Sequence, residues 1–97
     1  MCIRDSDGIV VDGFDRAAPA GVGNIKAAGN YAPDVAPSAQ MKEQGYPICL
    51  YLDAKENAYV EEFSTSNFIG ITQEGVLVTP ESPSILPSCT KLSLIHI

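Results

Sequence analysis

Short apolar segments follow one another at close intervals in the second half of the chain, and this spacing restricts the fold more than any other feature. After Gly45 these segments cover residues 48–53, 59–63, 67–72 and 75–79. Short strands joined by turns of a few residues pair antiparallel, whereas a parallel connection needs a crossover of a dozen residues or more. The sequence therefore predicts an antiparallel meander, which ends where Pro80, Pro83 and Pro87 interrupt regular structure.

One helix is predicted before these strands, over about 34–44. Asp34 is a candidate N-cap, and Gly45 can end the helix in the left-handed conformation that glycine tolerates. Pro37 fits only in the first turn, where its missing N–H costs nothing. The residues expected on the core face are Val35, Ala36 and Ala39. Helix and strands together predict an α+β fold, a mainly antiparallel sheet with a helix after the loop that carries Lys26.

Composition excludes several classes of partner. The chain has 97 residues, with 6 Lys+Arg against 12 Asp+Glu and a net charge of −6. This length suits one small domain. No nucleic-acid partner is expected, because phosphate binding needs clustered basic side chains. No apolar run approaches the roughly 20 residues of a membrane span, so no membrane association is expected.

Cysteine and histidine usage narrows the chemistry further. The number of cysteines is odd, and none of the three, Cys2, Cys49 and Cys89, has CxxC spacing with another. We therefore expect free thiols and a cytoplasmic location, and we expect no metal site. The single histidine, His96, lies at the C-terminal edge. A Ser-His or Cys-His hydrolase is therefore not expected, and any acid–base chemistry must come from Lys, Glu or Tyr.

Lys26 stands out among the lysines through its neighbours. Residues 17–31 contain one cation, no anion and eight Gly or Ala residues. An ammonium packed among such small groups would lose hydration, and its pKa would fall. A neutral amine can attack a carbonyl, so Lys26 is a candidate Schiff-base lysine, although a solvated surface lysine is the commoner reading.

Glu61 and Glu62 interrupt an apolar strand. Adjacent strand residues face opposite sides, so one carboxylate should point inward if the other points to water. Two readings stay open: edge charges that prevent aggregation, or a buried carboxylate that needs a cationic partner. Further along, residues 88–90 can open a helix, and a helix start can bind phosphate through its free N–H groups.

Several segments, taken in order, resemble the branched-chain amino-acid aminotransferase family, which belongs to fold type IV of the pyridoxal-phosphate enzymes. The stretches 16–19 (RAAP) and 26–31 (KAAGNY) resemble the region around the family's cofactor lysine. The remaining similar segments are 43–45, 50–54, 60–68, 78–80 and 85–90. Several motifs in the right order are more specific than any one of them.

The resemblance implies a role for six residues toward pyridoxal 5'-phosphate. Lys26 is implied to bind the cofactor covalently and to move the proton at the substrate α-carbon. Tyr31 is implied to hydrogen-bond the phenolic oxygen, and Glu62 to pair with the ring nitrogen. The other implied cofactor contacts are Leu86, which would pack against the ring, and Cys89 and Thr90, which would bind the phosphate. Ala28, Ser88 and Cys89 depart from the usual family residues, without removing an implied role.

The resemblance further implies that residues 7–91 are a fragment of the larger, cofactor-binding domain. The expected activity of the complete enzyme is amino transfer between leucine, isoleucine or valine and 2-oxoglutarate, and the enzyme is expected to be a homodimer. We expect the fragment to be inactive alone, since the family's N-terminal domain and later large-domain segments are missing. Residues 1–6 and 92–97 look like translated adapter sequence, so both ends are expected to be non-native.

Two alternatives remain at this point. A D-amino-acid aminotransferase or an aminodeoxychorismate lyase has the same fold and shares the cofactor lysine and glutamate. A non-catalytic acidic remnant with a binding or structural role would suit a chain that is native at both ends.

Overall fold

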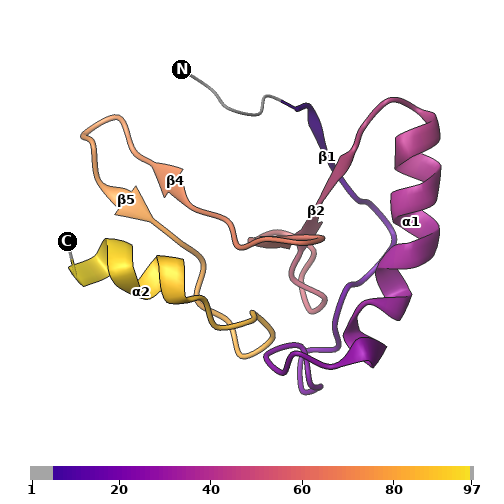
Figure 1. The fold of residues 1–97 in the computed structure, drawn as a ribbon, viewed down its shortest axis with the longest axis horizontal. Coiled ribbons are helices and arrows are strands. Elements are labelled where there is room, and N and C mark those ends of the chain that lie inside the picture. The colour runs from indigo at the N-terminus through magenta and orange to yellow at the C-terminus, as the bar shows by residue number, and fades with distance from the viewer. Residues whose placement is uncertain (1–5, 97) are drawn as a thin grey trace.

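The structure is a computed structural model that describes residues 6–96, so residues 1–5 and 97 of the two expected non-native ends lie outside the described residues. Helices and strands are both present, and the strands form two separate sheets (Figure 1). The elements are β1 (Gly8–Val10), a 3-10 turn η1 (Ala28–Asn30), α1 (Ala32–Glu43), β2 (Ile48–Leu52), β3 (Val60–Phe63), β4 (Gly70–Ile71), β5 (Leu77–Val78) and α2 (Cys89–His96). The predicted α+β class is confirmed.

The first sheet has the strand order β1–β2–β3 and mixes both directions. β2 and β3 pair antiparallel, as predicted, whereas β1 lies parallel to β2 with Ile9 opposite Cys49. The prediction of one antiparallel meander is wrong here, because the long crossover through α1 returns the chain in its original direction. β4 and β5 form a separate antiparallel pair, with Gly75 in the turn at a φ of 81°.

Helix α1 begins two residues earlier than predicted. Because it starts at Ala32, Asp34 lies inside the first turn and Pro37 falls in the second turn, so both placements were wrong. The residue at the N-cap is Tyr31, whose side chain makes no capping hydrogen bond. The predicted C-terminal end is confirmed, since Gly45 has a φ of 94° and donates its N–H to the carbonyl of Lys42.

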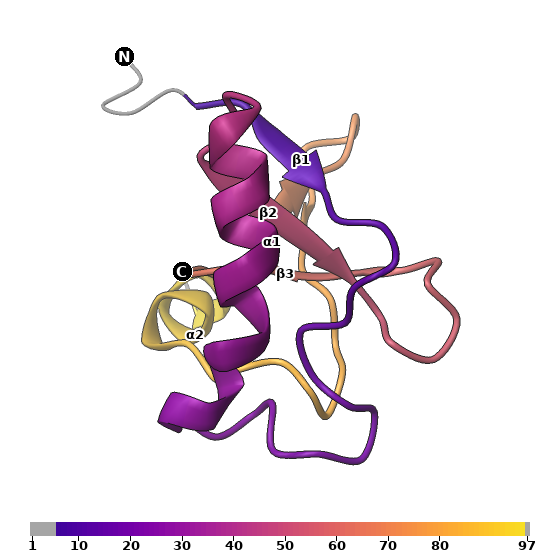
Figure 2. The same ribbon diagram turned by 90° about the vertical axis from the view of Figure 1, so that its right-hand side faces the viewer.

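The face of α1 that points to the core also differs from the prediction. Val35, Ala36 and Ala39 are exposed, while Pro37 is buried and Met41 packs against the core. That core contains Val11, Cys49 and Tyr51. In Figure 2, α1 lies in front of β2, the strand that carries Cys49 and Tyr51.

A partly buried hydrogen bond joins α1 to the central strand. The Tyr51 hydroxyl donates to Asp34 Oδ1 at 2.5 Å, and Ser38 Oγ donates to Asp34 Oδ2 at 2.7 Å. Burial, together with the Asp34 carboxylate, raises the pKa of Tyr51 well above its usual range, so the phenol stays protonated and keeps donating. Asp34 therefore anchors the helix to β2 instead of capping it.

The chain after β3 forms the second sheet and α2, which lie on the side of the molecule opposite to α1 (Figure 1). Ser88 Oγ accepts the N–H of Lys91 at 3.2 Å, so a helix does open at 88–90, as predicted. No residue of β4, β5 or α2 is buried. None of the helices among residues 6–96 has the length and apolar character needed to cross a membrane.

Candidate functional site

A break in strand pairing places two carboxylates together on β3. The register between β2 and β3 shifts between Tyr51 and Leu52, which leaves Glu61 as an extra residue, as in a β-bulge. Glu61 and Glu62 are both buried, at 6% and 5% exposure. The expectation that only one of them points inward is therefore wrong, because a bulge interrupts the alternation of side chains along the strand.

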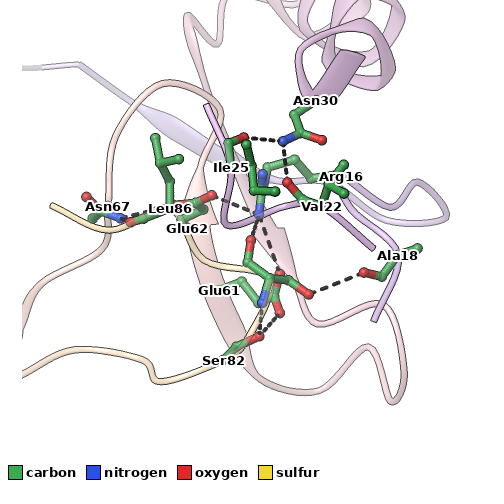
Figure 3. A network of polar contacts seen from close by, with 11 residues as sticks. Arg16, Ala18, Val22, Ile25, Asn30, Glu61, Glu62, Asn67, Ser82 and Leu86 are labelled. Atoms are coloured by element: carbon green, nitrogen blue, oxygen red, sulfur yellow. Dashed lines mark hydrogen bonds and ion pairs between the residues drawn. The ribbon is translucent and has the colours of Figure 1, made fainter. Parts of the chain in front are cut away.

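The cationic partner of these carboxylates is Arg16, which reaches them from the loop after β1 (Figure 3). Arg16 Nη2 lies 2.8 Å from Glu62 Oε1 and 4.0 Å from Glu61 Oε2, and it donates to the carbonyl of Ser84 at 2.5 Å. Arg16 is itself buried at 7% exposure. Of the two readings for the glutamates, the structure supports buried carboxylates with a cationic partner.

Each glutamate also has a neutral hydrogen-bond donor. Asn67 Nδ2 donates to Glu62 Oε2 at 3.1 Å and to the carbonyl of Leu86 at 2.8 Å, while Ser82 Oγ donates to Glu61 Oε1 at 2.7 Å. Burial raises the pKa of Glu62 above its usual value of 4.5, and the nearby Arg16 guanidinium partly offsets this effect.

The loop that carries Lys26 is held by contacts within itself and with the chain near Ser84. Asn30 Nδ2 donates to the carbonyls of Val22 and Ile25, at 2.6 and 2.5 Å. A Cβ at Gly23 would collide with the backbone oxygen of Ser84, so this close approach requires glycine. Lys26 itself is exposed, so the structure shows the commoner of the two readings for its surroundings, a solvated lysine that small neighbours do not bury.

One pocket brings four of the six predicted cofactor residues together. Its lining includes Lys26, Tyr31, Glu62 and Leu86, which come from the loop, the start of α1, strand β3 and the segment before α2. The pocket thus presents an amine, a phenol, a carboxylate and an apolar side chain. These residues are up to 60 positions apart in the sequence, and the fold alone makes them neighbours.

The two predicted phosphate contacts are not part of this lining. Cys89 and Thr90 are the first residues of α2, and both are exposed. The first α-helical hydrogen bond of α2 runs from the N–H of Leu92 to the carbonyl of Ser88. The N–H groups of Cys89 and Thr90 come before Leu92 and have no partner within the helix. The structure therefore gives them free donors at a helix start but does not bring them into the Lys26 pocket.

Sequence reasoning missed Arg16 and Asn67 as partners of Glu62. Arg16 could have been found, because it is the only arginine in residues 6–96 and a buried carboxylate requires a cation. Asn67 carried no comparable signal. Within the same range, no group of three or more His, Cys, Asp or Glu side chains is placed to hold a metal ion.

Comparison with known proteins identifies the family. A family profile described as amino-transferase class IV matches residues 7–97. The chain belongs to the class IV aminotransferase family. It is 47% identical to a branched-chain-amino-acid aminotransferase of Helicobacter pylori, over 88% of this chain and 25% of the relative.

Two further relatives show the same pattern of coverage. A branched-chain-amino-acid aminotransferase of Haemophilus influenzae is 47% identical over 87% of this chain and 26% of its own length. An aminotransferase of Gibberella zeae is 47% identical over 87% of this chain and 23% of its own length. The chain thus spans about a quarter of the length of the curated relatives that it matches.

Proposed function

We propose that this chain is part of a pyridoxal-phosphate-dependent branched-chain amino-acid aminotransferase. The complete enzyme would transfer an amino group between leucine, isoleucine or valine and 2-oxoglutarate. Membership of the class IV family and the names of the Helicobacter pylori and Haemophilus influenzae relatives support this proposal. The observation that carries it is the pocket shared by Lys26, Tyr31, Glu62 and Leu86.

The chemistry of this pocket fits pyridoxal 5'-phosphate. That molecule carries an aldehyde, a phenolic oxygen and a basic ring nitrogen, and the pocket presents an amine, a phenol and a carboxylate. When bound, the cofactor supplies an electron-withdrawing ring that stabilises negative charge on the substrate α-carbon. Glu62 suits the ring nitrogen because a buried carboxylate with a raised pKa accepts strongly from a protonated ring.

Each residue has a separate task in this proposal. The Lys26 amine would bind the aldehyde carbon with loss of water and, once the substrate amine has replaced it there, would take up the proton that leaves the substrate α-carbon. Tyr31 donates its hydroxyl to the phenolic oxygen, and Glu62 keeps the ring nitrogen protonated. Leu86 packs against the ring and limits its orientation, and packing of this kind excludes water from one side of the site.

The phosphate would bind at the start of α2. Cys89 and Thr90 have backbone N–H groups that the helix does not use, and the positive end of the helix dipole favours an anion. For this contact the start of α2 and the Lys26 pocket must face the same bound molecule.

The 97 residues alone are proposed to be inactive. A substrate carboxylate is usually held by a free arginine, which binds it through two parallel hydrogen bonds. The only arginine in residues 6–96 is Arg16, and its guanidinium is buried against Glu62 and Ser84. Substrate binding would therefore depend on other parts of the complete protein, which we propose to be a cytoplasmic homodimer.

Covalent labelling tests the cofactor lysine directly. The full-length protein is incubated with pyridoxal 5'-phosphate, reduced with borohydride and mapped by peptide mass spectrometry. We expect the label on Lys26, with Lys55 as an internal control because it is exposed and distant in sequence. Labelling of Lys55 and Lys26 to the same extent would contradict the proposal.

A substrate panel then tests the reaction. Full-length protein should form glutamate from 2-oxoglutarate with L-leucine, L-isoleucine or L-valine, and the 97-residue chain should form none. Preference for D-alanine, or release of pyruvate from aminodeoxychorismate, would instead identify one of the other enzymes with this fold.

A further inference from the structure

The buried cluster on β3 contains one more negative charge than positive charge. Glu61 and Glu62 are both buried, and among residues 6–96 the only cation that forms an ion pair with either is Arg16. With all three side chains ionised, the cluster has a net charge of −1. A buried charge without a partner is costly, so this arrangement calls for a second cation.

The two carboxylates have different surroundings. Glu62 lines the Lys26 pocket, whereas Glu61 does not and instead lines a separate hollow with Ser82. Arg16 lies between these environments, closer to Glu62 at 2.8 Å than to Glu61 at 4.0 Å. A cation bound in the Lys26 pocket would thus contact Glu62 directly, whereas Glu61 would act on it only by electrostatic attraction at longer range.

We propose that Glu61 is a positioning residue that offsets the positive charge of Arg16, so that the buried cluster presents a net negative charge to the cationic ring of the cofactor. This inference rests on the proposed function. Without Glu61, Arg16 and Glu62 would neutralise each other, and the arriving ring cation would face a pair with no net charge. With Glu61 present, the four charges sum to zero once the protonated ring is bound.

The electrostatics of Glu62 agree with this assignment. The negative charge of Glu61 contributes to raising the pKa of Glu62, while Arg16 opposes it. The other cation on the pocket is Lys26, which is exposed and whose nitrogen is committed to the aldehyde in the proposed function. Lys26 therefore does not supply the missing positive charge.

Cofactor affinity in a set of charge variants tests the proposal. The dissociation constant of pyridoxal 5'-phosphate is measured by absorbance titration for full-length wild type, Glu61→Gln, Arg16→Met and the double variant. Glu61→Gln keeps the hydrogen bond to Ser82 but removes one charge, so it should weaken binding about tenfold, which corresponds to about 1.4 kcal/mol. The double variant restores the wild-type net charge of −1 and should bind more tightly than Glu61→Gln alone.

A cofactor analogue with carbon in place of the ring nitrogen provides the matched control. This ring cannot become a cation, so wild type and Glu61→Gln should bind it equally. The inference is overturned if Glu61→Gln binds the natural cofactor as tightly as wild type does. It is also overturned if Glu61→Gln weakens binding of the analogue as much as it weakens binding of the natural cofactor. If wild type binds no cofactor at Lys26, the proposed function fails first and the inference with it. If the double variant is unfolded at the assay temperature, the comparison of wild type with Glu61→Gln, using the natural cofactor and the analogue, is enough to test the inference.

Discussion

The two sheets of this chain differ sharply in how they are stabilised. The β1–β2–β3 sheet, covered by α1, contains Cys49 and Tyr51 at 1% and 0% exposure. The β4–β5 pair and α2 contain no buried residue, and Leu77 on β5 is 49% exposed. Burial fixes the position of a side chain before any ligand arrives, so Glu62 on β3 is preorganised. The free N–H groups at the start of α2 have no such support.

The largest expected effect contrasts two tyrosines. Tyr51→Ala removes a fully buried ring and its bond to Asp34, and should lower the free energy of unfolding by about 4 kcal/mol. Tyr59→Ala is the control, because Tyr59 is 65% exposed and its loss should cost less than about 0.5 kcal/mol. Urea denaturation of the full-length protein measures both. Equal losses would mean that the first sheet is not the stable part of the chain.

A pair of glycines tests the junction between the lysine loop and Ser84. Gly23→Ala would push a Cβ into the Ser84 backbone oxygen and to 2.8 Å from Ala17 Cβ, at a cost of about 2 kcal/mol. Gly29→Ala introduces no contact within 4 Å and should change stability by less than about 0.5 kcal/mol. Thermal unfolding compares the two, and a tolerated Gly23→Ala would show that the loop and Ser84 are not in contact.

The buried glutamate predicts a pH dependence of definite sign. Because the pKa of Glu62 is raised in the folded state, the folded protein binds this proton more tightly than the unfolded chain. The free energy of unfolding of wild type relative to Glu62→Gln should therefore be greatest below about 4.5, the usual glutamate pKa, and should fall as pH rises through the raised pKa. Denaturation curves from pH 4 to about 8 measure the difference, and an opposite slope would mean that the Arg16 ion pair outweighs burial.

The smallest effects on stability are expected at the start of α2, which lies in the exposed region. Cys89→Ile and Thr90→Pro should each change the free energy of unfolding by about 0.5 kcal/mol or less, since neither N–H is used inside the helix. Their effects on cofactor affinity should differ, because only Thr90→Pro removes an N–H from the proposed phosphate contact. Equal affinities for the two variants would rule out that contact.

Local signals in the sequence predicted local structure well. Apolar runs bounded by turn residues predicted β2, β3 and the β4–β5 turn at Gly75, and the end of α1 at Gly45 was also correct. These features depend on neighbouring residues, which a sequence displays directly. The roles of Lys26, Tyr31, Glu62 and Leu86 were implied by the family resemblance and stay a prediction, although all four line one pocket.

The features that were missed depend on contacts between distant residues. The parallel partner of β2 is β1, some forty positions earlier, and no local pattern reveals such a pair. A bulge decided the orientation of Glu61, and bulges leave no fixed sequence pattern. The reading in which small neighbours desolvate Lys26 does not hold, because such neighbours cannot cover a lysine unless another segment packs over it.

The contact between Arg16 and Ser84 has a consequence for the order of folding, because it joins residues 68 positions apart. Closing so long a loop is entropically costly, and such contacts form after local ones. On the ribosome, β2 and β3 can pair before residue 84 is synthesised, whereas the Arg16 cluster cannot be completed. We therefore expect the complete cluster, with its contact to Ser84, to form after the transition state. Loss of Arg16 would accordingly speed unfolding and leave the folding rate nearly unchanged.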